Sequence, residues 1–302
     1  MTTPQQVLST PSAAMASSPP GGKRRVPLVL LPLLILLFVF LVAPATILLV
    51  YSFWQGGNFQ VVREITVENY LAAVTSPTYR AVLLNAMGVG VVTATITAVL
   101  SYVVAYWLRF RVMVGRNLVL YLILLSMLSG YLMRVYAWRT ILGRTGLLNS
   151  TLLHFGLVDQ PVLSLAFSRI AVALALINIF IPFAVLPIQA SLSSVPDELI
   201  EAARDLGLGP TRVFWRVTLP LTMSGVYWAF LYTLILSAGD YITPELLGGV
   251  SGSMIGRSIA QQFVASGDQP MGAALSFVVL AVYAVIFLVV RSLFRRARWL
   301  PR

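Results

Sequence analysis

Apolar residues are arranged along this chain in six long runs that polar segments separate. The runs cover residues of about 27–53, 81–108, 118–138, 170–191, 220–239 and 271–290. Each run is long enough for a helix that crosses roughly 30 Å of hydrocarbon, which takes about 20 largely apolar residues. The pattern predicts an all-α polytopic membrane protein, with six transmembrane helices in one domain over residues 26–302.

The first 25 residues follow a different pattern. Residues 1–22 are mainly Thr, Ser, Pro, Gln, Ala and Gly without apolar periodicity, which predicts that 1–25 form a disordered cytoplasmic tail. The run from Val26 to Trp54 is too long for a signal-peptide core and lacks a small-residue cleavage site. We therefore expect it to be retained as the first span, with bends at Pro27, Pro32 and Pro44.

The second run carries a small residue at every fourth position, at Ala86, Gly90, Ala94 and Ala98. Small side chains on one helix face let another helix backbone approach closely. This small-residue stripe predicts close helix packing, either within the chain or against another chain.

A polar insert, residues 193–219, separates the fourth and fifth runs. Pro196 suits the first turn of a helix, and the acidic residues that follow it favour the positive end of the helix dipole. Gly207 can adopt the left-handed conformation that ends a helix, and Gly209-Pro210 then turns the chain. A second short segment, Arg212 to Val217 with Thr211 as its cap, precedes Leu219-Pro220. The insert is predicted to be a helix-turn-helix at the membrane surface, and an interfacial loop without a partner is the alternative.

The spacing of the insert resembles the cytoplasmic loop of permease subunits of ABC importers of the type I fold. The matching positions are Glu201, Ala202, Ala203, Gly207, Val217, Leu219 and Pro220, with Val217 where isoleucine is commoner. In that family the loop is a coupling helix that sits in a groove of the ATPase subunit. The resemblance implies that Glu201 and Ala202 meet the ATPase and that Gly207 makes the turn.

Three other segments look like the spermidine/putrescine branch of these permeases, in a similarity that runs from about residue 27 to 295. They are Ile65 to Tyr70, Arg134 to Arg139 followed by Gly143 to Asn149, and Gly239 to Gly249. Relatives that carry other solutes, such as opines, aminophosphonates or iron, share similar sequence motifs. Asp240 and Glu245 would suit a polyamine cation, whereas Arg134, Arg139 and Arg144 would equally suit an anion.

Composition and charge fix the class and predict the orientation. The chain has 302 residues, of which 58% are hydrophobic and 10% charged, and a net charge of +11. Fourteen of its 21 Lys and Arg residues flank the spans on one side, in groups at 23–25, 109–116, 204–216 and 291–302. The positive-inside rule then places the insert and both termini on the cytosolic side of the membrane, and the resemblance implies that this is a bacterial inner membrane. Because the arginines cluster at span ends, anionic lipid headgroups are expected as partners and nucleic acid is not.

Polar residues within the apolar runs are the candidates for a substrate path. Asn178 lies four residues before Pro182, which leaves the Asn178 carbonyl without its helical partner. Thr233, Ser237 and Asp240 share one helix face, with Tyr232 beside them. Asp240 could instead be solvated at the headgroup level. The middle of each span lacks Lys, Arg, Asp and Glu, which argues against a proton or sodium relay.

The chain itself is not expected to bind a cofactor or metal. It lacks a phosphate loop ending in Gly-Lys-Ser/Thr, since its only lysine is Lys23 in Gly-Gly-Lys-Arg-Arg. The resemblance therefore implies a pair of separate ATPase subunits that use ATP, a second permease and an extracytoplasmic solute-binding protein that docks on loops 134–169 and 240–270.

Two rival classes are weaker. An intramembrane serine protease would use the Gly-x-Ser-Gly motif at Gly249 to Gly252, with His154 as the base that activates Ser251. However, His154 and Ser251 lie in loops outside the apolar runs. A transporter driven by an ion gradient would need the mid-span acids that this chain lacks.

Overall fold

The computed structural model describes residues 31–57, 59–112, 114–162 and 165–296. The chain divides into two units, Met1–Ile47 and Leu48–Arg302. The predicted tail over 1–25 and Pro27 lie outside the described residues. The first unit holds α1 (Leu31–Leu37), the π-helical η2 (Phe38–Val42) and the start of α2 (Ala43–Tyr51). The π-helical turn ends two residues before Pro44, because a proline disrupts α-helical hydrogen bonding to the preceding turn, and the bends at Pro32 and Pro44 stay predictions.

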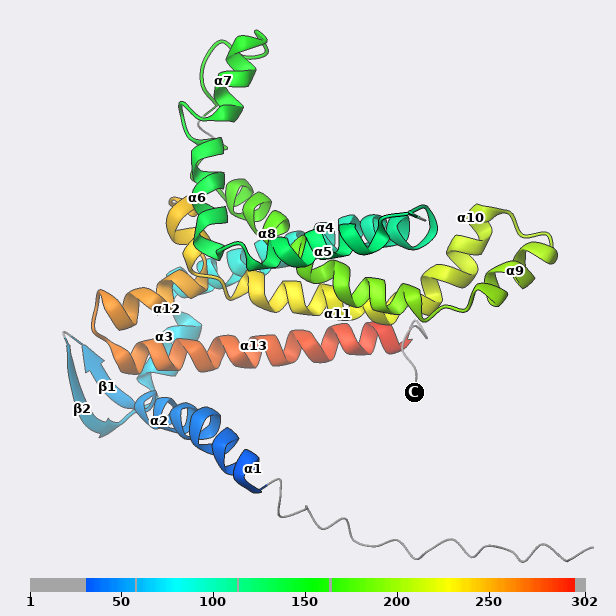
Figure 1. The fold of residues 1–302 in the computed structure, drawn as a ribbon. Coiled ribbons are helices and arrows are strands. Elements are labelled where there is room, and N and C mark those ends of the chain that lie inside the picture. The colour runs from blue at the N-terminus through cyan, green and yellow to red at the C-terminus, as the bar shows by residue number, and fades with distance from the viewer. Residues whose placement is uncertain (1–30, 58, 113, 163–164, 297–302) are drawn as a thin grey trace, which may run out of the picture. The chain divides into compact units, whose positions relative to one another are not determined.

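Four long apolar helices run alongside one another in the second unit (Figure 1). They are α4 (Pro77–Phe110), α8 (Arg169–Ser193), α11 (Leu219–Ala238) and α13 (Gln269–Arg296). Each passes a length and hydropathy test for a membrane span, α11 together with the turns that precede it from Pro210. The second, fourth, fifth and sixth predicted spans are thus present as helices.

The third predicted span is not one straight helix. It is divided into α5 (Arg116–Leu128) and α6 (Tyr131–Leu142), and the chain bends by 89° between them. Ser129 has an extended backbone and Gly130 follows it, and this pair of weak helix formers interrupts the helical hydrogen bonds. The helix over 118–138 is thus broken, and whether this segment crosses the membrane as one span stays a prediction. A further short helix, α7 (Leu147–His154), follows.

The number of spans among the described residues is therefore four, or five if the bent pair counts as one. The first predicted span is represented by the apolar helical stretch Ile35–Tyr51, which is shorter than those four. A count of six stays a prediction.

Short elements fill the connections at one end of the four long helices. An antiparallel hairpin of β1 (Trp54–Gly57) and β2 (Gln60–Ile65) precedes α3 (Glu68–Thr75). The π-helical η4 (Pro244–Gly248) and α12 (Ile255–Val264) lie between α11 and α13. The fold is thus helical as predicted, apart from a two-stranded hairpin that the apolar pattern did not reveal.

Side-chain contacts distinguish the two ends of the bundle. At one end, which we call the α9 end, Tyr227 in the first half of α11 lies 5.1 Å from Phe294 near the end of α13, measured between ring centroids. At the other, the α12 end, Asn85 near the start of α4 donates to the carbonyls of Ser251 and Ser253. Arg109, Arg116, Arg204, Arg212 and Arg216 belong to elements at the α9 end, and Arg80, Arg134, Arg169 and Arg257 to elements at the α12 end (Figure 1). These arginines of the groups at 109–116 and 204–216 are thus separated in space from Arg80, Arg134, Arg169 and Arg257.

The small-residue stripe of α4 packs inside the chain. Ala86 and Ala94 are fully buried, and a Cβ added at Gly90 would lie 2.8 Å from the Cβ of Ala238 in α11. Gly225 in α11 approaches α8 as closely, because a Cβ there would lie 2.6 Å from the Pro187 carbonyl oxygen. Of the two readings of the stripe, packing within the chain is confirmed.

This close approach predicts that Gly90→Leu lowers stability. The added side chain must displace Ala238 and Leu234, and overpacking of this kind typically costs about 1–3 kcal/mol. Gly88→Leu is the matched control, because nothing lies within 4 Å of a Cβ there. The measurement is thermal denaturation in detergent, and equal melting temperatures for the two variants would contradict the packing role.

Candidate coupling surface and substrate path

The predicted helix of the insert is α9 (Asp197–Asp205), and it presents two faces. Ile200 and Ala203 are buried in a small apolar cluster with Val195 and Val213. Leu199, Glu201, Ala202 and Leu206 are exposed, Leu206 to 83%. The helix is thus held against the bundle by one face while the other, carrying both Glu201 and Ala202, is free among the described residues.

Gly207 ends α9 as predicted. It has φ of +80°, in the left-handed region that residues with a Cβ avoid. Its N–H donates to the Arg204 carbonyl (2.8 Å), and the next N–H, of Leu208, donates to the Ala203 carbonyl (3.1 Å). These two bonds form a Schellman motif, which satisfies carbonyls that the end of the helix leaves open.

The segment after the turn differs from the prediction. Gly209 rather than Thr211 precedes the first helical residue, and α10 (Pro210–Val213) continues through the π-helical η3 (Phe214–Thr218) directly into α11. The prediction of a separate second helix that ends at Val217 was therefore wrong. The wider π turn lies just before Pro220, a residue that lacks the N–H an α-helix needs at that position.

Three of the coupling candidates support the surface rather than form it. Ala203 is 7% exposed, and Leu219 is half-buried beside the apolar cluster that contains Ala184 and Ile188. Pro220 lies in the first turn of α11. Ala203 holds α9 through its apolar cluster, whereas Glu201, Ala202 and Gly207 are the exposed candidates that another protein can contact.

At the α12 end, Asp240 is the centre of a hydrogen-bonded cluster. The Tyr131 hydroxyl donates to Asp240 Oδ2 (2.7 Å) and lies 2.6 Å from Thr243 Oγ1. The backbone N–H groups of Ile242 and Thr243 also donate to the carboxylate, at 3.2 and 3.1 Å. Asp240 thus ties the break between α5 and α6 to the end of α11, and it is half-buried rather than simply solvated.

Asn178 lies on an exposed part of α8, where Trp138 Nε1 donates to its side-chain oxygen (3.3 Å). Arg134 donates to the Ile179 carbonyl (3.2 Å) one residue further on, close to Pro182, which lies inside α8. The sequence reasoning missed both Tyr131 and Trp138, although Trp138 belongs to the segment Arg134 to Arg139 that carries the family resemblance.

The candidates on α11 are divided between two faces. Thr233 and Ser237 are fully buried, whereas Tyr232 is 44% exposed and stacks on Phe183 of α8. Glu245 in η4 forms an ion pair with Arg257 of α12 (2.5 Å). The structure thus brings Asn178, Tyr232 and Asp240 to accessible or half-buried positions, and it places Thr233 and Ser237 in the helix packing.

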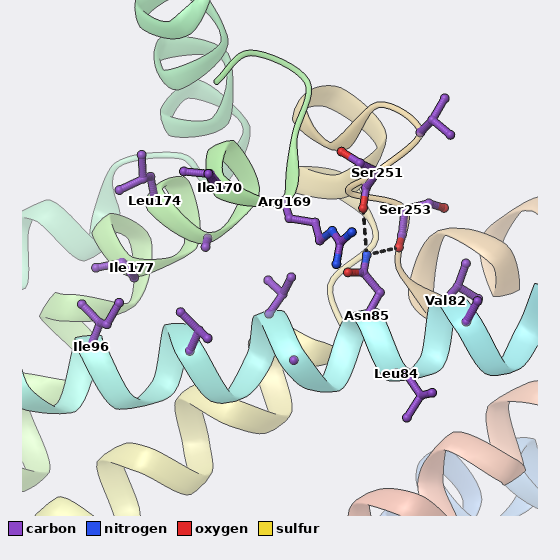
Figure 2. A pocket seen from close by; sticks show the side chains of 16 residues that line it. Val82, Leu84, Asn85, Ile96, Arg169, Ile170, Leu174, Ile177, Ser251 and Ser253 are labelled. Atoms are coloured by element: carbon purple, nitrogen blue, oxygen red, sulfur yellow. Dashed lines mark hydrogen bonds between the residues drawn. The ribbon is translucent and has the colours of Figure 1, made fainter. Parts of the chain in front are cut away.

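A separate groove of about 870 Å³ lies between α4 and α8 at the α12 end (Figure 2). Its walls are apolar side chains such as Val92, Ile96 and Leu174, and its polar mouth is formed by Asn85, Arg169 and the Ser251 and Ser253 loop. The residues that line it include none of the substrate-path candidates. A lining this apolar, with a cation at its mouth, does not suit the passage of a polycation.

A family model described as binding-protein-dependent transport system inner membrane component matches residues 26–299. The spermidine/putrescine transport system permease protein PotB of Haemophilus influenzae is 31% identical over 255 residues, which is 84% of this chain and 88% of that protein. PotB of Escherichia coli (strain K12) is 32% identical over 256 residues, covering 84% and 92%. A putative 2-aminoethylphosphonate transport system permease protein, PhnU of Salmonella typhimurium, is 24% identical over 268 residues, covering 89% and 90%.

Solved structures show the same fold. A bacterial ABC transporter involved in the import of the acidic polysaccharide alginate matches with a TM-score of 0.73, 18% identity, and coverage of 89% of this chain and 94% of that one. The MetNI methionine ABC transporter matches with a TM-score of 0.53, 15% identity and coverage of 76% and 100%.

The fold and the exposed α9 surface define a permease subunit of an ABC importer. The chain belongs to the family of binding-protein-dependent transport system inner membrane components, and it is a multi-pass protein of the bacterial inner membrane. Its relatives are transport subunits and not enzymes, so the protease alternative is not supported.

The turn after α9 predicts a graded series at Gly207. A left-handed conformation costs a residue with a Cβ roughly 1–2 kcal/mol, so Gly207→Asn should be tolerated best, Gly207→Ala less, and Gly207→Pro least because it also removes the N–H bonded to Arg204. Each variant is scored by copurification with the ATPase. Gly209→Ala is the control, since Gly209 has φ of −66° and open space around it. A Gly207→Pro variant that binds the ATPase as well as Gly209→Ala would contradict the role of the turn.

Proposed function

We propose that this chain is the membrane-spanning permease subunit of an ATP-driven importer for a polyamine such as spermidine or putrescine. The observation that carries this proposal is the two-faced α9, anchored by Ile200 and Ala203 and exposing Glu201 and Ala202. It is combined with 31–32% identity to spermidine/putrescine permeases over 84% of the chain.

The coupling function follows from the exposed face of α9. Leu199, Ala202 and Leu206 offer apolar contacts, and Glu201 adds a negative charge beside them. A mixed surface of this kind suits a protein groove better than bare lipid, because headgroup-facing helices tend to be rich in Lys and Arg on their polar face. ATP closing a pair of ATPase subunits would move α9, and α8 and α11 would move with it.

The remaining partners follow from the same architecture. A second permease, identical or related, would complete the pore, and a solute-binding protein would dock at the α12 end, on the loops near α7 and α12. The arginine-rich α9 end would then face the cytosol together with both termini, by the positive-inside rule.

Glu201→Arg is predicted to weaken ATPase association and abolish ATP-dependent uptake while the protein stays in the membrane, because Glu201 is exposed and contributes little to folding. Glu64→Arg is the control, since it makes the same charge change on the exposed β2 strand. Copurification with the ATPase and uptake into proteoliposomes are measured. Normal values for Glu201→Arg would rule out the coupling surface.

The polyamine proposal rests on accessible groups near the α12 end that suit a linear cation. Asp240 supplies a carboxylate, Asn178 an amide oxygen, and Tyr232 and Trp138 aromatic faces that attract ammonium groups. Glu245 is a lesser candidate on the same route because Arg257 already neutralises it. Thr233 and Ser237 would reach a substrate only if α11 separated from its neighbours.

An aminophosphonate is the alternative cargo, because PhnU is also a relative and several arginines lie at the α12 end. Two of these arginines have other contacts. Arg134 donates to two backbone carbonyls, and Arg139 lies over the Phe167 ring. The polyamine is therefore favoured.

Asp240→Asn is predicted to lower polyamine uptake with assembly kept, because the amide keeps the size of the carboxylate but loses its charge. Tyr131→Phe is the comparison, since it removes the bond to Asp240 and leaves the charge. Uptake is measured across substrate concentrations, and we expect roughly a tenfold loss for Asp240→Asn, the size of an effect of about 1.4 kcal/mol. Unaltered uptake would remove Asp240 from the path, and an equal loss in both variants would assign it a structural role only.

A further inference from the structure

The start of α9 is tied to α4 by an ion pair. Arg109 Nη2 lies 2.6 Å from Asp197 Oδ1, and Asp197 is the first residue of α9. The two residues are 88 positions apart in the sequence. The Arg109 side chain is 18% exposed, and its guanidinium lies 5.2 Å from the Phe110 ring centroid. Because its stem and one face are packed, the guanidinium is held in place to meet Asp197.

A second polar contact ties the chain just before α9 to α5. Arg116, the first residue of α5, donates to Ser193 Oγ at the end of α8 (3.1 Å). In the amide orientation that satisfies both its ends, Gln189 accepts from Arg116 (2.7 Å) and donates to the Ala105 carbonyl of α4 (3.0 Å). Gln189 is 6% exposed. A cation at a helix N-terminus opposes the helix dipole, so these acceptors are what stabilise Arg116 in this position.

The packing beneath α9 is incomplete. A cavity of about 350 Å³ lies between the end of α4 and the insert, lined among others by Phe110, Ile200 and Val213. Phe110 of α4 packs against the apolar cluster of α9, but the cavity leaves part of α9 without apolar contact to α4. The Arg109–Asp197 pair closes this gap with a polar contact at the start of the helix.

We propose that Arg109 and Arg116 are positioning residues that clamp the start of α9 to α4 and α5. This clamp rests on the proposed coupling function and extends it. Through the chain alone, a displacement of α9 reaches α8 and α11. Through the clamp it also reaches α4 and α5, and α5 leads at its other end to Tyr131 and the Asp240 cluster. Movement driven by ATP is thereby passed to the helices beside the substrate path.

The clamp contributes to transmission more than to folding. Asp197 is 63% exposed, and exposed ion pairs add little to folding free energy. The apolar cluster around Ile200 and Ala203 keeps α9 folded without it. Loss of the pair should therefore leave assembly and ATP hydrolysis in place and lower the transport obtained from each ATP.

The test uses the full transporter, with its ATPase, second permease and binding protein, in proteoliposomes. Transporters that carry Arg109→Glu or Asp197→Arg are each expected to hydrolyse ATP in response to loaded binding protein. The amount of substrate taken up per ATP should fall roughly fivefold or more, which is the typical size of energetic coupling between two sites. The double variant restores the pair with its charges exchanged and should recover most of the ratio. Arg109→Lys keeps the charge and should lose little.

Arg295→Glu is the matched control, because it makes the same charge change at an exposed position in the last turn of α13, outside the contact with Asp197 and outside the lining of the cavity beneath α9. A double variant no better than either single one would overturn the clamp, as would single variants that keep the normal ratio. Loss of ATPase copurification in Arg109→Glu would also overturn it, by showing that the residue shapes the docking surface instead. These outcomes are distinct from failure of the proposed function, in which the unaltered transporter itself shows no ATP-dependent uptake.

Discussion

The close approach of three helix backbones is the constraint on which the rest of this structure depends. Gly90 brings α4 against Ala238 of α11, and Gly225 brings α11 against Pro187 of α8. In a bilayer, lipid tails are as apolar as the helices, so association relies on van der Waals contact at short distance and not on exclusion of water. Only small residues allow that distance. The resulting bundle fixes where the ends of α4, α8 and α11 lie, and both candidate sites are built on those ends.

The polar interactions of the two candidate sites are placed where the helices end or break. Asp240 follows α11, Tyr131 follows the break after α5, and Asp197 begins α9. Mid-span positions would make unpaired polar groups costly, whereas helix ends leave backbone groups open and are close to water. Thr233 and Ser237 differ from these residues, because they lie within α11 and their side chains are fully buried in the helix packing.

Different residues of the α9 insert attach the helix to the bundle and form its exposed surface. Ile200 and Ala203 attach the helix, the Schellman motif at Gly207 ends it, and the ion pair with Arg109 orients its start. Glu201 and Ala202 are left exposed by these attachments. A docking surface of this kind is rigid enough to move as a body, which is what conversion of ATPase closure into helix movement would require.

The local sequence pattern was sufficient to predict the long apolar helices, the start of α9 near Pro196 and the left-handed conformation of Gly207. Each of these features depends on composition or on the conformational preference of one residue. The bend at Ser129 and Gly130 and the continuous helix from Pro210 into α11 were not predicted, since an apolar run does not show where its hydrogen bonds change register. The contacts of Tyr131 with Asp240, of Arg109 with Asp197 and of Arg116 with Gln189 join residues distant in sequence. Only the packed bundle brings those residues together, because such contacts depend on how helix ends are placed and not on any spacing along the chain.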